Sequence, residues 1–141
     1  GLTVFTAAGN HGPSPSSIGA PGNSRKIITV GSSDVLPDSD DTDYSGRGPT
    51  NACVCKPDLV APGCGIISCC NEPGRYFIKS GTSMSTPLVS GAIALLLEKY
   101  PSMSNKDVKL RIRERAVDLG LPHNQQGWGK LDVKRLLADE I

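Results

Sequence analysis

Ser80-Gly81-Thr82-Ser83-Met84-Ser85-Thr86-Pro87 is the stretch that decides the fold. It lies between a β-prone segment, residues 75–79, and an apolar run, residues 88–97. Proline is tolerated only in the first turn of a helix, so a helix begins at Pro87 or within one turn before it. The hydroxyl of Ser83 then lies beside backbone N–H groups that have no partner inside the helix.

A hydroxyl beside free amides at the start of a helix has two interpretations. It can be a nucleophile next to a site for an oxyanion. Alternatively, Thr82 and Ser83 only cap a buried helix, which is the commoner explanation for so short a stretch taken alone. The choice therefore depends on the longer pattern of the chain.

The chain opens with an apolar run, residues 2–8, that predicts a buried parallel strand. Gly9 and Asn10 follow it directly. Ligands gather at the carboxyl ends of parallel strands, so Asn10 stands where chemistry is expected. The alternative is an ordinary turn in which Asn10 bonds to its own backbone.

Three segments, in this order, resemble those of the subtilisin family of serine proteases. They are AAGN at residues 7–10, KPDLVAPG at residues 56–63 and GTSMSTPLVSGAIALL at residues 81–96. Residues 44–49 and 127–132 resemble further segments of the family. The resemblance implies an α/β fold, the subtilisin-like three-layer sandwich with a parallel sheet. Residues 1–141 are similar to only the carboxyl-terminal half of that catalytic domain.

The resemblance also implies roles for individual residues. Ser83 would be the nucleophile that forms an acyl-enzyme, and the Asn10 amide with the Ser83 N–H would form the oxyanion hole. The implied substrate-binding residues are Ala7, Ala8, Gly9, Gly19, Ala20 and Thr82. Because Gly19 and Ala20 are small, the specificity pocket is expected to be roomy. The implied substrate is a protein or peptide, and the chemistry requires no cofactor.

A serine nucleophile needs a base, and the base needs an orienting group. The family supplies these from D-S/T-G and H-G-T-H-x-A-G motifs, and neither motif occurs in this sequence. His11 and His123 are interpreted as surface histidines, although a Ser83–His11 pair is an alternative. The expected partner is therefore a missing amino-terminal half, and the chain alone is expected to be inactive.

Half of a parallel sheet leaves an unpaired edge, which predicts a homodimer through that edge. Two other classes of function stay open. One is a non-catalytic binding or regulatory protein on the same fold, and the other is a cysteine-rich metal-binding module.

Composition excludes several partners. The net charge is +1 and no basic tract occurs, so nucleic acid is not expected. No apolar run approaches the ~20 residues that cross a bilayer, so no membrane partner is expected. The acidic stretch, residues 38–43, lacks the glycine and glutamate of an EF-hand loop and is interpreted as solvated. Family members often hold structural calcium, but no ligand set can be assigned here, and no metal site is predicted.

The chain has five cysteines: Cys53, Cys55, Cys64, Cys69 and Cys70. Their spacing matches no usual zinc motif, and the odd number argues against a complete disulfide framework. Free thiols are the main interpretation, with a disulfide or a metal site as alternatives. Free thiols persist in reducing compartments, which mildly favours the cytoplasm.

The remaining segments are expected to form strands and helices that support the site without taking part in the chemistry. Strands are expected at 26–32, 65–68 and 76–79, and a helix buried on all sides at 83–100. Ser104 is expected to cap a second helix that ends at Gly120, and a last helix is expected over 133–138. On the second helix the predicted apolar stripe is Val108, Ile112, Ala116 and Leu119. The residues predicted to face water are Lys109, Arg111, Arg113, Glu114 and Arg115.

Overall fold

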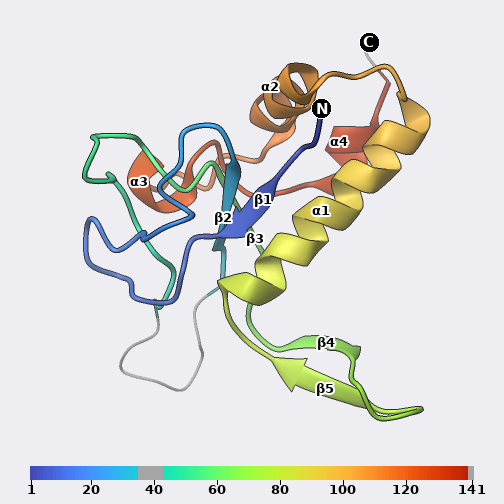
Figure 1. Ribbon diagram of the computed structural model, residues 1–141, viewed down its shortest axis with the longest axis horizontal. Helices are drawn as coiled ribbons and strands as arrows, with labels where there is room; N and C mark the ends of the chain where they lie inside the picture. The colour runs from blue at the N-terminus through green and yellow to red at the C-terminus, as the bar shows by residue number, and fades with distance from the viewer. Residues whose placement is uncertain (35–42, 140–141) are drawn as a thin grey trace.

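A computed structural model describes residues 1–34 and 43–139. The acidic stretch that was expected to form a solvated loop lies outside the described residues except for Asp43. The centre of the fold is a parallel sheet in the order β1-β2-β3 (Figure 1). These strands are Phe5–Ala7, Ile28–Ser32 and Leu59–Ala61, with Ala7 opposite Val30 and Gly31 opposite Val60. The α/β class with a parallel sheet is thus confirmed.

Helix α1, Thr82–Lys99, crosses one face of this sheet and contacts all three strands (Figure 1). Helix α4, Val133–Leu137, packs on α1, and α2, Asn105–Arg115, packs on α4. The buried side chains between sheet and helices form one core: Ile28, Val30, Leu59, Ala61, Val89, Ala92, Ile93, Leu96, Val108, Ile112 and Leu136. Among the described residues, no helix is both long and apolar enough to cross a membrane.

The expectation that α1 is buried on all sides is wrong. Its core side is buried, but the opposite side is exposed, with Leu88 40% and Leu95 49% exposed. Ala94 also lies on this exposed strip. The strip is uncovered because the described residues pack against only one side of α1.

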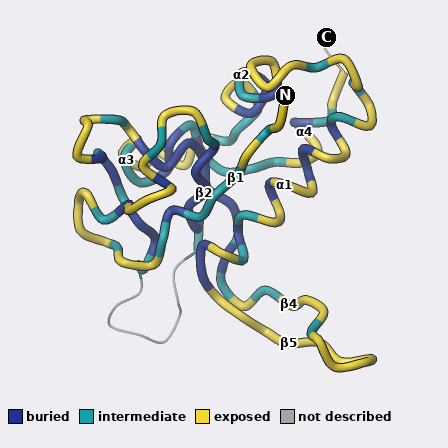
Figure 2. Tube along the Cα trace, in the orientation of Figure 1, coloured by how far each residue is buried: buried dark blue, intermediate teal, exposed yellow. Residues whose placement is uncertain are grey.

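Strand β1 is half-buried rather than fully buried, which is a second correction. Only β2 pairs with it among the described strands, so its other edge is open. Figure 2 colours parts of α1 and most of the segment before β1 as exposed. An edge strand keeps one row of backbone groups unpaired, and apolar composition alone does not reveal which strand stands at the edge.

An antiparallel hairpin stands apart from the sheet near the start of α1 (Figures 1 and 2). Its strands are β4, Ile66–Cys69, and β5, Tyr76–Lys79, as the sequence predicts. Ile67, Tyr76 and Ile78 are each about two-thirds exposed. The hairpin therefore contributes little to the core.

Helix α2 begins as predicted but ends earlier. Ser104 and Asp107 form a reciprocal capping box, which confirms the predicted cap. The helix ends at Arg115, so Leu119 does not extend its apolar stripe. A short helix that the sequence did not predict, α3, His123–Gln126, follows.

Arg111 was expected to face water and is instead buried, at 4% exposure. Its Nε donates to the Leu136 carbonyl at 3.1 Å, and an Nη donates to the Ala138 carbonyl. Its guanidinium also lies 5.6 Å from the ring centroid of Tyr100. Carbonyls at the end of α4 thus satisfy the buried charge, and no pattern within α2 could reveal them.

Candidate active site

The carboxyl end of β1 meets the amino end of α1 (Figure 1). Asn10 follows β1, and its Oδ1 accepts hydrogen bonds from the backbone N–H of Thr82 and from the Thr82 hydroxyl, both at 3.0 Å. The Thr82 hydroxyl in turn accepts from the Gly9 N–H at 3.1 Å. The fold therefore brings Asn10 beside Ser83, the residue after Thr82.

These bonds orient the Asn10 carboxamide. With Oδ1 accepting from Thr82, the Nδ2 amide is the group left to donate elsewhere. A Cβ placed on Gly81 would lie 3.2 Å from Asn10 Nδ2, and Gly81 has a φ of +145°. That backbone conformation strongly favours glycine, so Gly81 allows the carboxamide and the turn to lie close together.

Ser83 is exposed and occupies the second position of α1. The first backbone N–H groups of a helix have no intrahelical partners and lie at its positive end. Because α1 has 18 residues and no acidic residue in its first turn, this end is free to favour a developing negative charge. Asn10 is also exposed, so the Asn10 amide and the Ser83 hydroxyl are both accessible from solvent.

Thr82 was expected to contact substrate, but the structure places it at 0% exposure. Its hydroxyl accepts from the Gly9 N–H and donates to Asn10 Oδ1. Thr82 therefore does not reach the surface itself and contacts the surface residues only through Gly9 and Asn10.

The other expected substrate residues lie on two adjacent segments. Ala8 is buried, while Ala7 and Gly9 are half-buried at the end of β1. The loop with the exposed residues Gly19 and Ala20 packs beside that end. A Cβ on Gly22 would lie 3.1 Å from the Ala7 carbonyl oxygen, which shows how closely the loop approaches β1.

Neither histidine is hydrogen-bonded to Ser83 in the described structure. His11 is exposed next to Asn10, and His123 lies at the start of α3 with Nδ1 2.9 Å from the Gly127 carbonyl oxygen. Within residues 1–34 and 43–139, no hydrogen bond joins either imidazole to Ser83.

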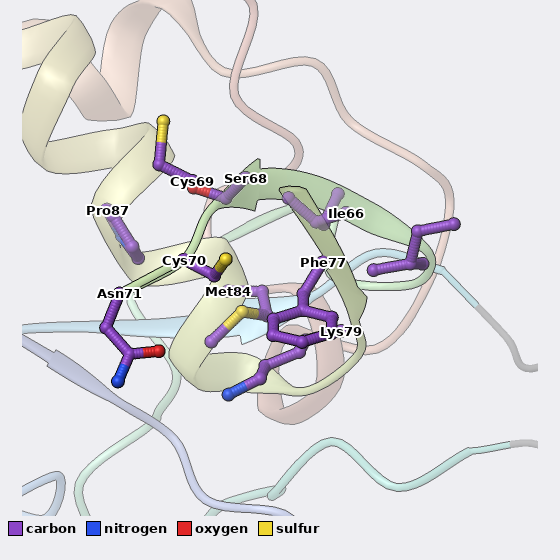
Figure 3. Close-up of a pocket in the computed structure, with 10 residues that line it drawn as sticks. Ile66, Ser68, Cys69, Cys70, Asn71, Phe77, Lys79, Met84 and Pro87 are labelled. Carbon is purple, nitrogen blue, oxygen red and sulfur yellow. The ribbon is translucent and has the colours of Figure 1, made fainter. Parts of the chain in front are cut away.

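Two hollows flank the amino end of α1. A cavity of about 560 Å³ lies between the hairpin and α1 (Figure 3). Its lining includes Met84, Phe77 and Pro87, together with Cys69 and Cys70. A more open hollow of about 620 Å³ runs along β1 and is lined by residues 2–7 and by four residues of α1: Ser83, Thr86, Pro87 and Ser90.

The five cysteines are free thiols, of which Cys53, Cys55 and Cys69 are exposed. In the described part of the chain, no group of three or more His, Cys, Asp or Glu residues is arranged to hold a metal ion.

A buried ion pair just before β3 was not predicted from the sequence. Lys56 is 1% exposed, and its Nζ lies 2.5 Å from Asp58 Oδ2 and 2.8 Å from the Ile27 carbonyl oxygen. Asp58 Oδ2 also accepts from the Thr29 N–H at 2.7 Å. Burial lowers the pKa of Lys56, and the bond to Asp58 opposes that change. The pair ties the segment before β3 to β2, and the two opposite charges two residues apart were the signal available in the sequence.

Comparison with known proteins identifies the family of the chain. The model of the subtilase family matches residues 1–129. Serine protease AprX of Bacillus subtilis is 40% identical over 127 residues, covering 77% of this chain and 29% of AprX. Halolysin of Haloferax mediterranei is 36% identical over 137 residues, covering 97% of this chain and 24% of halolysin.

Solved structures of proteases superpose on this chain. The Clostridium perfringens CspB protease superposes with a TM-score of 0.73 at 31% identity, covering 89% of this chain and 29% of that one. The prenylagaramide maturation protease PagA superposes with a TM-score of 0.75 at 26% identity, covering 96% and 50%. The chain spans less than a third of AprX and of halolysin. Because the family model matches most of its length, the chain belongs to the subtilase family.

Proposed function

We propose that this chain forms the carboxyl-terminal part of the catalytic domain of a serine endopeptidase. Ser83 is the nucleophile, and the Asn10 amide with the Ser83 N–H binds the oxyanion. The observation that supports this most is the pair of hydrogen bonds from Thr82 to Asn10 Oδ1, which sets the Asn10 amide beside the amino end of α1.

The proposed reaction begins when Ser83 Oγ attacks the carbonyl carbon of a peptide bond and loses its proton to a base. The carbonyl oxygen becomes an oxyanion between Asn10 Nδ2 and the Ser83 N–H. The C–N bond then breaks, and the amine leaves with the proton that the base returns. Water hydrolyses the acyl-enzyme by the same steps and frees Ser83.

Hydrogen-bond donors that are held in place before the reaction stabilise the oxyanion without reorganisation. Loss of one such donor typically costs ~100- to 1000-fold in turnover. Thr82 holds Asn10 through its backbone N–H and its hydroxyl, and that hydroxyl accepts from the Gly9 N–H, so the Asn10 amide needs no rearrangement when charge develops.

The histidine base and its aspartate are proposed to come from an upstream segment. The hollow along β1, which Ser83 lines, and the exposed strip of α1 are where that segment would pack. Without it Ser83 has no base, and we expect the chain alone to be inactive. Alone, the chain would cover the same surfaces by forming a homodimer through the open edge of β1.

The proposed substrate is a protein or peptide. Ala7, Ala8 and Gly9 would form one wall of the pocket for the residue before the cleaved bond, and Gly19 and Ala20 would form its base. The chemistry requires no cofactor. A structural calcium ion, frequent in the family, has no assigned ligands in this chain.

A fluorophosphonate probe tests the proposal, because it reacts only with an activated serine. The chain is labelled alone, then after mixing with an upstream segment of the same protein that carries the histidine and aspartate motifs. We expect labelling only in the mixture and none with Ser83→Ala.

Labelling of the chain alone would mean that another group, such as His11, activates Ser83. No labelling in a mixture that has folded together would favour the second candidate, a non-catalytic binding or regulatory protein on the same fold.

A further inference from the structure

A carboxylate next to the sheet holds the loop that follows β3. Asp34 comes two residues after β2 and is half-buried. Its Oδ2 accepts from the backbone N–H groups of Gly63 at 2.8 Å and Cys64 at 3.2 Å. Its Oδ1 accepts from the Ser33 hydroxyl at 3.2 Å. Both oxygens are engaged, so the carboxylate fixes the position of residues 63–64.

That loop in turn holds the two residues before Thr82. The Gly81 N–H donates to the Gly63 carbonyl oxygen at 2.8 Å. One position earlier, Ser80 Oγ accepts from the Gly65 N–H at 2.9 Å. The turn that leads into α1 is therefore attached to the loop at two adjacent residues.

The loop packs directly against the first turn of the helix. A Cβ on Gly63 would lie 2.3 Å from Ser85 Oγ and 2.7 Å from Ser32 Oγ. It would also lie 3.0 Å from the Gly81 carbonyl oxygen. Because Gly63 packs directly on the first turn of α1, a shift of the loop is passed to Gly81 and to the residues after it.

We propose that Asp34 is a positioning residue for the oxyanion site, acting through Gly63 on Gly81 and Ser83. This inference rests on the proposed function, because it needs a reacting Ser83. Asp34 itself touches no substrate. It sets the Ser83 N–H relative to Asn10, whose backbone follows β1 and whose Oδ1 accepts from the Thr82 N–H and hydroxyl.

The size of the expected effect follows from how far a catalytic group can be displaced before the rate falls. Functional groups must be held within about 0.5 Å of their productive positions. A misplacement of about 1 Å can cost on the order of 100-fold in rate. Without the Asp34 carboxylate, the Gly63 and Cys64 N–H groups lose their acceptor and the loop is free to shift.

Three substitutions separate positioning from general stability. Asp34→Ala removes the acceptor. Asp34→Asn keeps one oxygen that can accept from both N–H groups, and Asp34→Glu keeps the charge but moves the carboxylate by one methylene. The matched control is Asp132→Ala, because Asp132 Oδ1 likewise accepts from a backbone N–H, that of Arg135 at 2.9 Å, at the start of α4.

The measurement is the time course of fluorophosphonate labelling of the chain mixed with its upstream segment. A merely structural role lowers the fraction of molecules that label and leaves the rate constant of that fraction unchanged. A positioning role lowers the maximal rate constant at full final labelling, with little change in the probe concentration that gives half-maximal rate.

We expect the rate constant to fall about 10- to 100-fold with Asp34→Ala, and about 10-fold with Asp34→Glu. Asp34→Asn and Asp132→Ala should stay within about threefold of the unchanged chain. If Asp34→Ala does not fold, the labelling rate constants of Asp34→Glu and Asp34→Asn test the positioning role instead. Equal rate constants for Glu and Asn, or an unchanged rate for Ala, would overturn the role of Asp34. Failure of the unchanged mixture to label would instead reject the proposed function.

Discussion

Thr82 donates two hydrogen bonds to a single atom of Asn10, one from its backbone N–H and one from its hydroxyl, and each is 3.0 Å long. The same hydroxyl accepts from the Gly9 N–H. One buried side chain thus connects the end of β1 to the start of α1 and sets the direction of the Asn10 amide. The geometry proposed for Asn10 and Ser83 therefore depends on this connection.

Replacing Thr82 by Val should slow the reaction of Ser83. The isosteric side chain keeps the volume but leaves the half-buried Gly9 N–H without an acceptor and removes one bond to Asn10. We expect the rate of fluorophosphonate labelling in the mixture to fall about 10-fold, because Asn10 is held by one bond instead of two. Thr82→Ser keeps the hydroxyl and should label near the original rate. Equal rates for Val and Ser would mean that the hydroxyl does not orient Asn10.

Asn10→Ala should lower turnover of a peptide substrate by ~100- to 1000-fold with little change in KM, because the lost donor acts in the transition state. The measurement is steady-state hydrolysis of a peptide amide by the recombined protein. Asn51→Ala, in an exposed turn, is the matched control and should be neutral. A change confined to KM would assign Asn10 to substrate binding instead.

A charge on the exposed strip of α1 should prevent recombination. Ala94 is exposed in this chain, so Ala94→Arg should leave its circular dichroism spectrum unchanged. Buried against an upstream segment, the same charge would carry a desolvation cost of several kcal/mol. We therefore expect Ala94→Arg to abolish co-purification with that segment. If the homodimer uses the same face of α1, its formation should also be lost. Leu110→Arg on α2, where Leu110 is 51% exposed, is the control. Normal recombination of Ala94→Arg would place the upstream segment elsewhere.

Lys56→Met should destabilise the chain strongly. It removes the Lys56 ammonium from the Asp58 carboxylate, which is 7% exposed, and leaves only Lys109 Nζ, 3.9 Å from Asp58 Oδ1. Removal of one partner from a buried pair typically costs about 3–5 kcal/mol. Urea unfolding measures the loss, and the double change Lys56→Met with Asp58→Asn should recover part of it, because the amide oxygen can still accept from the Thr29 N–H. No recovery would mean that lost packing, rather than the unpaired charge, is responsible.

Stability should fall in alkaline solution partly through Tyr44. Its hydroxyl donates to Ser32 Oγ at 2.8 Å, and burial raises the pKa of Tyr44. The hydrogen bond to Ser32 opposes that rise. Because the folded pKa exceeds the unfolded one, the unfolded chain loses its proton first. This contribution is complete below about pH 10 and is lost as the pH rises through the folded pKa.

The test for Tyr44 is a comparison of urea midpoints between about pH 8 and about pH 11 for the chain and for Tyr44→Phe. The difference between them should shrink or reverse in favour of the variant as the pH rises. A difference that stays constant across this range would show that Tyr44 titrates equally in both states.

The sequence by itself determined the parallel α/β class, the helix that starts just before Ser83 and the strand that ends before Asn10. These follow from local chemistry: apolar runs set strand and helix, and Ser104 with Asp107 satisfies the first N–H groups of α2. Pro87 was expected in the first turn of its helix but lies inside α1, past that turn, so it located the start of the helix only approximately. The ordered segments at residues 7–10, 56–63 and 81–96 also identified the family.

Only the tertiary structure decided which surfaces are covered and which distant groups meet. The half-exposed α1, the open edge of β1 and the burial of Arg111 all depend on what lies opposite each residue. The same is true of the bonds from Asp34 to the loop at residues 63–64, 29 residues away or more. Local patterns record propensity and periodicity, whereas a buried charge or a hydrogen bond across the fold is stabilised by partners that the local pattern does not contain.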